Sequence, residues 1–280
     1  DFEDLDAGDT SVQTFTYSVN DSTTDSAANE TVTVTVTGVN DAPVMDNTGT
    51  MLLTSIFENA AAPTGDLVSA IIATSAANGG NAITDADASA VEGIAISAVD
   101  DTEGTWQYSI NAGVDFTDIS TVSGSQSLLL GAADMVRYVP TQGTNGAVGP
   151  GITFRAWDQT SGTAGTKVDT ASSGGTTAFS TATETAAITV IAWSTVEFGS
   201  ASSNGAESVT PATLTVTVDP ATLLEVTVNY AVTGGTATGS GTDYTLASGT
   251  LTFAASDVSE TIGITIENDL LDEANETIEV

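Results

Sequence analysis

The feature that most constrains this chain is an alternation of apolar and polar side chains with a period of two residues. Phe15-Thr16-Tyr17 begins the pattern, and threonine and valine alternate strictly in the segment from Thr31 to Thr37. Successive side chains of an extended strand point to opposite faces, so this period predicts strands that are buried on one face. The pattern recurs at Ile94/Ile96, Trp106/Tyr108/Ile110, Ile152/Phe154/Ala156, Leu214/Val216/Val218, Val226/Val228/Tyr230, Leu251/Phe253 and Ile262/Ile264/Ile266.

The segments between these runs are rich in Gly, Asn, Asp and Ser, which favour turns. No segment carries an apolar period of about 3.6 residues over the length of a helix. The sequence therefore predicts an all-β protein, and short strands at this spacing favour sandwiches. Trp106 and Tyr108 share a strand face with Ile110, so we expect Trp106 in a core. The alternative for Trp106, Tyr108, Trp157 and Trp193 is stacking on a glycan.

The charge balance limits the possible partners. The chain has 280 residues, of which 37 are acidic and 3 are basic, for a formal net charge of -34. Nucleic-acid binding needs a Lys/Arg surface that this composition lacks, and anionic membranes would repel the chain. Self-repulsion on this scale requires screening. Hard divalent cations, which prefer oxygen ligands, are one candidate, and adaptation to a salty medium is the other.

The sequence contains neither cysteine nor histidine. Disulfides, thiolate metal sites and a serine triad with histidine are therefore excluded. We predict no enzymatic activity, although paired carboxylates are too common here for counting alone to exclude glycoside hydrolysis. The longest apolar stretches, such as Ala186 to Trp193, are too short to span a bilayer. We expect no membrane insertion.

Three segments can be separated: residues 1–43, 44–192 and 193–280. Pro43 cannot donate to a sheet ladder and biases Ala42 toward an extended conformation, which favours a boundary there. The second segment contains a Gly/Ser/Thr-rich stretch from Gly162 to Ser180, which we predict to be a surface hairpin or loop. The third begins at Trp193. We expect the chain to start inside one module and to stop before the last strand of another.

Each segment resembles a known module. The first is similar to the C-terminal part of a VCBS-type, cadherin-like repeat through Phe2 to Asp9, Phe15 to Asp21 and the tail Gly38 to Pro43. The second resembles another cadherin-like repeat of giant, RTX-like bacterial surface adhesins. Its matching residues are Phe57-Glu58-Asn59-Ala60, Ile83-Thr84-Asp85-Ala86-Asp87-Ala88, Gly104 to Ser109 and Phe154 to Asp158. The third is similar to a Calx-β domain through Gly235-Thr236-Ala237, Gly241 to Tyr244, Gly249 to Phe253 and Asn268-Asp269.

These resemblances imply tandem immunoglobulin-like sandwiches with Ca²⁺ held at the module junctions. By analogy with cadherin junctions, Asn40 and Asp41 of the linker would meet Asp85, Asp87 and Asp158 of the second module. The alternative interpretation is that these residues bind no ion, and that Asn and Asp occupy turns because they tolerate turn geometry. Glu58 matches an early glutamate of the family that points toward the other end of the module. Asp4, Asp6 and Asp21 match ligand positions for a junction upstream of the first module.

In the Calx-β segment, five acidic residues match family positions: Glu207, Asp243, Asp269, Glu273 and Glu276. The segment also departs from the calcium-sensing pattern, because Gly234 and Ser248 stand where the family has acidic residues. We therefore predict one weak calcium site in this segment, or none.

The resulting prediction is a secreted or cell-surface array of modules, a calcium-stiffened spacer of a surface adhesin or fibre. Its partners would be flanking modules of the same chain and a host or matrix glycan or protein. Two alternatives stay open: a glycan- or protein-binding module, and a filament subunit that donates a strand to copies of itself.

Overall fold

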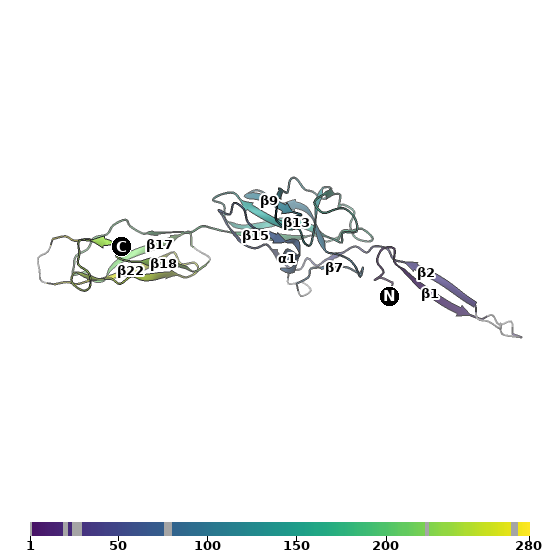
Figure 1. Cartoon of the computed structure of the whole chain (residues 1–280), viewed down its shortest axis with the longest axis horizontal. Helices are drawn as coiled ribbons and strands as arrows, with labels where there is room; N and C mark the ends of the chain where they lie inside the picture. The colour runs from purple at the N-terminus through teal and green to yellow at the C-terminus, as the bar shows by residue number, and fades with distance from the viewer. Residues whose placement is uncertain (1, 19–21, 24–29, 76–79, 222–223, 270–273) are drawn as a thin grey trace. The chain divides into compact units, whose positions relative to one another are not determined.

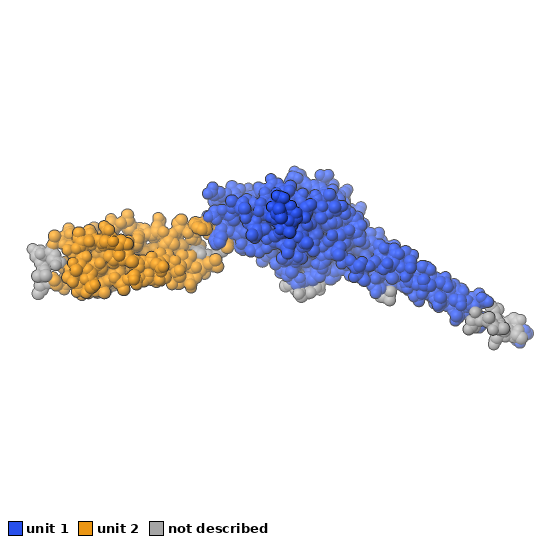
Figure 2. All heavy atoms as spheres, viewed as in Figure 1, with its two compact units in different colours: residues 1–190 blue, residues 191–280 orange. Residues whose placement is uncertain are grey.

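Strands make up nearly all of the regular structure, as the alternation predicts. The computed structural model describes residues 2–18, 22–23, 30–75, 80–221, 224–269 and 274–280. The chain divides into two compact units, residues 1–190 and residues 191–280 (Figure 1; Figure 2). The all-β fold class is confirmed in both units. The division into three modules, with boundaries after residues 43 and 192, stays a prediction.

One short helix departs from the predicted all-strand pattern. Helix α1 (Val68–Ala73) buries Val68, Ile71 and Ile72, which lie on one helical face. Six residues are too few for a helical period to stand out in the sequence, because the same letters read equally well as a short apolar strand. Within the described residues, no helix has the length and apolar character needed to cross a bilayer.

In unit 1, β1 (Thr10–Tyr17) and β2 (Glu30–Thr37) form a two-stranded antiparallel ribbon. The register pairs Phe15 with Val32, so Phe15, Tyr17 and the valines of β2 share one face, and threonine dominates the other face. The apolar face is exposed: Phe15 keeps 61% of its surface accessible and Tyr17 keeps 50%. Antiparallel pairing also places the start of β1 beside the end of β2. The linker, residues 38–43, begins there.

Most of the described strands of unit 1 that follow Pro43 form a sandwich of two sheets. The smaller sheet has the strand order β10-β9-β12-β6 and the larger has β14-β11-β8-β13-β15-β4, with β5 beside β15. The bounds are β3 (Val44–Met45), β4 (Met51–Leu52), β5 (Ile56–Phe57), β6 (Asp66–Leu67), β7 (Ile83–Thr84), β8 (Gly93–Val99), β9 (Gly104–Ser109), β10 (Thr117–Asp118), β11 (Ser127–Gly131), β12 (Met135–Pro140), β13 (Gly146–Trp157), β14 (Lys167–Val168) and β15 (Glu184–Ile191).

The core of this sandwich lies between the two sheets. Trp106 and Tyr138 from the smaller sheet pack with ring centroids 4.9 Å apart. Phe154 and Ile94 of the larger sheet join the same buried cluster. Trp106 is 1% exposed, which confirms its predicted core position.

The stretch from Gly162 to Ser180 is more than the surface loop that its composition predicted. Its Phe179 is 6% exposed and packs with Trp157 and Leu129 on the outer face of the larger sheet. That face is therefore covered, which explains why consecutive residues of β11 are buried instead of alternating. Part of this stretch is β14, which pairs with β11 at the edge of the larger sheet, while Ala178 and Phe179 pack against Trp157. Composition alone does not distinguish such a packed stretch from a free loop.

Unit 2 is a smaller β-structure with its own core. Val216, Phe253 and Ile262 are buried between its strands. The described strands are β16 (Thr195–Phe198), β17 (Ala212–Asp219), β18 (Val226–Tyr230), β19 (Gly234–Gly235), β20 (Tyr244–Thr245), β21 (Gly249–Phe253), β22 (Ser259–Ile266) and β23 (Ile278–Glu279). They form the sheets β16-β17-β22-β20, β18-β21 and β19-β23.

Candidate metal centre

The Asp-x-Asp sequence after β7 forms a tight bend. The backbone N–H of Asp87 donates to Asp85 Oδ1 at 3.0 Å, so one carboxylate oxygen holds the bend and the other stays available. Asp87 is only 9% exposed. Both carboxylates therefore lie at the end of the sandwich where β7 stops, within a span of three residues.

The linker reaches the same place because β3 pairs with β7. Val44 lies opposite Thr84, which brings the residues before Pro43 beside the Asp85–Asp87 bend. The backbone N–H of Asp41 donates to Asp87 Oδ2 at 2.9 Å, and that of Ala42 donates to the carbonyl oxygen of Gly175 at 2.8 Å. Backbone pairing thus places linker and bend together before any side chain is considered.

Asp158 joins the set from the end of β13. It is 2% exposed, and its Oδ1 accepts hydrogen bonds from the backbone N–H and the hydroxyl of Thr160 at 2.8 Å and 2.6 Å. Its Oδ2 accepts a hydrogen bond of 3.0 Å from Asn40 Nδ2. Asn40 Nδ2 also donates to the carbonyl oxygens of Asp41 and Thr177. The structure therefore brings together all five residues that the sequence assigned to this junction.

Three side-chain oxygens of this set are buried without a hydrogen-bond partner: Asn40 Oδ1, Asp85 Oδ2 and Asp87 Oδ1. Only Tyr138 Oη and Glu184 Oε2 share this condition in the part of the chain that the structure describes. A buried acceptor without a donor costs about 1 to 3 kcal/mol, and more when it is charged. Three such acceptors at one place, from two separate segments, point to an electropositive ligand.

The electrostatics lead to the same conclusion. Burial raises the pKa of Asp85 above its usual value, and the charges of Asp87 and Asp158 raise it further. The basic side chains of the chain interact elsewhere: Arg155 donates to the carbonyl oxygens of Ser180 and Thr181, and Lys167 donates to Ser120 and Thr121. Arg137 bonds to Gln107 and the Pro63 carbonyl oxygen.

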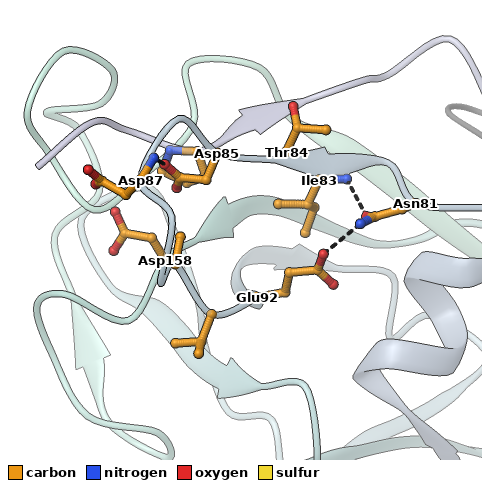
Figure 3. Close-up of a pocket in the computed structure, with 10 residues that line it drawn as sticks. Asn81, Ile83, Thr84, Asp85, Asp87, Glu92 and Asp158 are labelled. Atoms are coloured by element: carbon orange, nitrogen blue, oxygen red, sulfur yellow. Dashed lines mark hydrogen bonds between the residues drawn. The ribbon is translucent and has the colours of Figure 1, made fainter. Parts of the chain in front are cut away.

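A pocket of about 240 Å³ lies beside these carboxylates (Figure 3). Its lining includes Asp85, Asp87 and Asp158 at one end, while Glu92 accepts a hydrogen bond of 2.7 Å from Asn81 at the other. The pocket contains no basic side chain among its lining residues. A small cation fits such a space by charge, whereas an anionic ligand does not.

The donor set matches part of a calcium shell. Ca²⁺ takes about six to eight oxygen ligands and tolerates irregular geometry. The junction supplies three unpaired oxygens and further carboxylate oxygens that are already hydrogen-bonded. Within the described ranges, no group of three or more acidic, histidine or cysteine side chains is arranged to hold a metal ion. The junction residues therefore fit a hard cation only if water or backbone oxygen supplies the rest of its shell.

The other predicted ligands do not belong to this group of residues. Glu58 accepts a hydrogen bond of 2.9 Å from Asn145, which precedes β13, whereas Asp158 follows that strand. Glu207, Asp269 and Glu276 in unit 2 are exposed. Asp243 accepts a hydrogen bond from the backbone N–H of Thr238 and so stabilises its own turn. Glu273 and Asp21 fall outside the described residues.

Two contributors to the junction were not expected from the sequence. Asp6, predicted to face a junction upstream, instead accepts hydrogen bonds from the backbone N–H of Ser89 at 3.1 Å and from its hydroxyl. The prediction for Asp6 was wrong because it ignored that the β1–β2 ribbon is antiparallel. Because β2 ends at the linker and β1 is antiparallel to β2, β1 must begin beside the linker. This rule could have placed Asp6, which precedes β1, correctly.

Comparison with known proteins covers one part of the chain. Residues 192–280 match the Calx-beta domain, a non-catalytic family of β-sandwich domains that is associated with calcium binding. The resemblance of the third segment is thereby confirmed. No curated protein matches the chain.

Proposed function

We propose that this chain is a structural, extracellular array of β-sandwich modules that acts as a calcium-stiffened spacer of a bacterial surface adhesin or fibre. The observation that carries the proposal is the group of three buried, unpaired oxygens on Asn40, Asp85 and Asp87. They lie where the linker after the β1–β2 ribbon meets the following sandwich. The match of residues 192–280 to the Calx-beta domain, a family associated with calcium binding, supports the proposal independently.

The residues of the junction have separate roles in this proposal. Asp85 and Asp87 of the bend would hold the cation together with Asn40 of the linker, so the ion would connect two segments that are far apart in sequence. Asp158 orients the Asn40 side chain through the hydrogen bond between Asn40 Nδ2 and Asp158 Oδ2. When bound, calcium supplies positive charge to a cluster of carboxylates that has no basic partner.

The stiffening follows from mass action. A ligand that binds only the folded junction stabilises it by about 2.7 kcal/mol at a concentration of 100 times Kd. Extracellular calcium modules bind with Kd values of about 10⁻⁴ to 10⁻³ M, and a site with few protein oxygens belongs at this weak end. The spacer would therefore be stiff in millimolar calcium and looser without it.

The proposal includes no catalysis, because the chain has no histidine or cysteine, and no nucleic-acid partner, because it has only 3 basic residues. Its partners are flanking modules of the same chain and a host or matrix surface. The alternative of a glycan site built on tryptophans loses support, because Trp106 and Trp157 are both 1% exposed and only Trp193 keeps an accessible ring, at 55%.

The test is calorimetric unfolding of the 280-residue chain in 2 mM EDTA and in a calcium series up to about 100 times the Kd. We expect the unit 1 transition to rise by roughly 5 to 10 °C with calcium. Asp87→Asn should remove most of this rise, whereas Asp101→Asn, an exposed site with the same charge change, should keep it. An equal calcium response in both variants, or none in the wild type, would refute the junction site.

A further inference from the structure

The structure contains a second connection between the linker region and the sandwich, made without the candidate cation. It consists of Asp6, in the segment before β1, and Ser89, two residues after Asp87. The Asp6 carboxylate accepts hydrogen bonds from the Ser89 backbone N–H at 3.1 Å and from the Ser89 hydroxyl. We call this pair the Asp6–Ser89 latch.

The segment that carries Asp6 is itself attached to the linker. The N–H of Gly8 donates to the carbonyl oxygen of Gly38 at 3.1 Å, and the N–H of Gly38 donates to that of Asp9 at 2.8 Å. A Cβ atom at position 38 would lie 2.4 Å from the carbonyl oxygens of Leu5 and Asp6, so only glycine permits this approach. Asp6 is therefore held at the first residue of the linker.

The loop that carries Ser89 also contains the candidate ligands. The N–H of Asp41 in the linker donates to Asp87 of this loop, and Asp6 accepts from Ser89, two residues further along. The N–H of Ala90 donates to the carbonyl oxygen of Asp87 at 3.3 Å, which closes a turn around Ser89. The loop is thus held at two residues by the two segments that flank the β1–β2 ribbon.

A junction crossed by one chain segment can bend and twist about that segment. Here two segments cross, the linker and the segment from Asp6 to Asp9, and each hydrogen-bonds to the sandwich. A second attachment, at Ser89, opposes rotation that the attachment at Asp87 alone would allow. Hydrogen bonds to an ionised carboxylate are also stronger than neutral ones.

We propose that the Asp6–Ser89 latch is a cation-independent brace, which orders the loop of Asp85 and Asp87 and keeps the junction aligned when calcium is absent. Asp6 is thus a positioning residue for the candidate ligands. The role of the latch as a brace rests on the proposed spacer function, although the latch itself forms without calcium. Cation and latch would then be two parallel restraints on one junction.

The test measures the distance between two spin labels by pulsed electron resonance. The chain has no cysteine, so Thr14→Cys on β1 and Thr117→Cys on β10, both exposed, provide the label sites. Four proteins carry the labels: the otherwise unchanged chain, Ser89→Ala, Asp6→Asn and the control Asp9→Asn. The control removes the same charge from the same segment at an exposed side chain outside the latch. Each is measured in EDTA and in saturating calcium.

We expect a narrow distance distribution in EDTA for the parent and for Asp9→Asn, and a distribution about twofold broader for Ser89→Ala and Asp6→Asn. Calcium should narrow the two broad distributions. If both latch variants match the parent in EDTA, or if the parent is as broad as they are, the latch is overturned. If the latch variants broaden but calcium narrows nothing, the latch stands and the proposed calcium site fails.

Discussion

Two groups of acidic residues, one in each unit, matched calcium-binding patterns in the sequence, yet their surroundings differ. At the junction in unit 1, Asp87 and Asp158 are 9% and 2% exposed and come from separate segments. In unit 2, Glu207 and Glu276 are exposed. The comparison shows that residue type and order do not determine whether the fold buries the carboxylate oxygens, nor whether other groups already hydrogen-bond to them.

Asp243 illustrates the second condition. Its carboxylate accepts a hydrogen bond from the Thr238 backbone N–H, while the N–H of Asp243 donates to the Thr238 carbonyl oxygen at 3.0 Å. The side chain therefore closes a turn, which is the ordinary role of aspartate in loops. At the junction, by contrast, Asp85 uses one oxygen for its turn and buries the other without a partner.

Replacing Asp158 gives the largest expected contrast between the two groups. Asp158→Ala leaves the Thr160 N–H without its acceptor and removes one of the three acceptors of the Asn40 amide. We therefore expect a loss of about 3 kcal/mol in the free energy of unfolding of unit 1. Glu207→Ala should change unit 2 by no more than about 0.5 kcal/mol. Urea unfolding in EDTA, followed by tryptophan fluorescence and calorimetry, measures both. Equal effects would mean that burial does not separate the groups.

Asp243→Ala should have an intermediate effect. Loss of the turn hydrogen bond is expected to destabilise unit 2 by about 1 kcal/mol, with the same value in EDTA and in calcium. Calorimetry at both conditions is the measurement. A loss that appears only in calcium would instead make Asp243 a ligand and would remove the distinction drawn above.

Asp85→Asn should act in opposite directions with and without calcium. The raised pKa of Asp85 means that its ionised form is disfavoured in the folded state, so stability falls as the pH rises from below 3.8 through the folded pKa. The asparagine amide carries no charge, so its burial avoids this cost. We expect the free energy of unfolding of the calcium-free protein to rise by less than about 1 kcal/mol, because partial exposure screens the charges. The calcium-induced rise in Tm should shrink. A destabilised calcium-free variant would contradict this account.

The smallest effect concerns the latch. Hydrogen bonds from the Ser89 hydroxyl and N–H lower the pKa of Asp6 below 3.8. The latch is therefore fully formed above pH 3.8 and is lost as the pH falls through the folded pKa. Carbon-13 NMR titration of the Asp6 carboxyl should show a midpoint that moves up toward 3.8 in Ser89→Ala. An unchanged midpoint would show that Ser89 does not stabilise the ionised carboxylate.

Several elements of the fold could be predicted because their signal is local. Thr31 to Thr37 alternates and is a strand, and the alternation of Ile262 and Ile264 likewise marks β22. Helix α1 and the cover formed by Gly162 to Ser180 could not be predicted in this way. Their structure depends on which neighbouring surface they bury, and that surface comes from strands distant in the chain.

The candidate junction shows the same division. Asn40, Asp41, Asp85, Asp87 and Asp158 were named from their resemblance to a junction, and pairing of β3 with β7 places the first four together. The position of Asp6 was missed, because it depends on the direction of β1 relative to the linker. The unpaired state of three oxygens was also beyond prediction, since it depends on every donor in the surroundings.

The sequence by itself determined the fold class of the protein, because alternating side chains require strands. A net charge of -34 without cysteine or histidine also excludes thiolate and imidazole metal ligands and leaves oxygen ligands. Only the tertiary structure decided which acids differ from ordinary surface acids. Burial and hydrogen-bond satisfaction are properties of the packed surroundings. Asp243 can therefore close a turn with its carboxylate hydrogen-bonded, whereas Asp85 and Asp87 each bury a carboxylate oxygen without a hydrogen-bond partner.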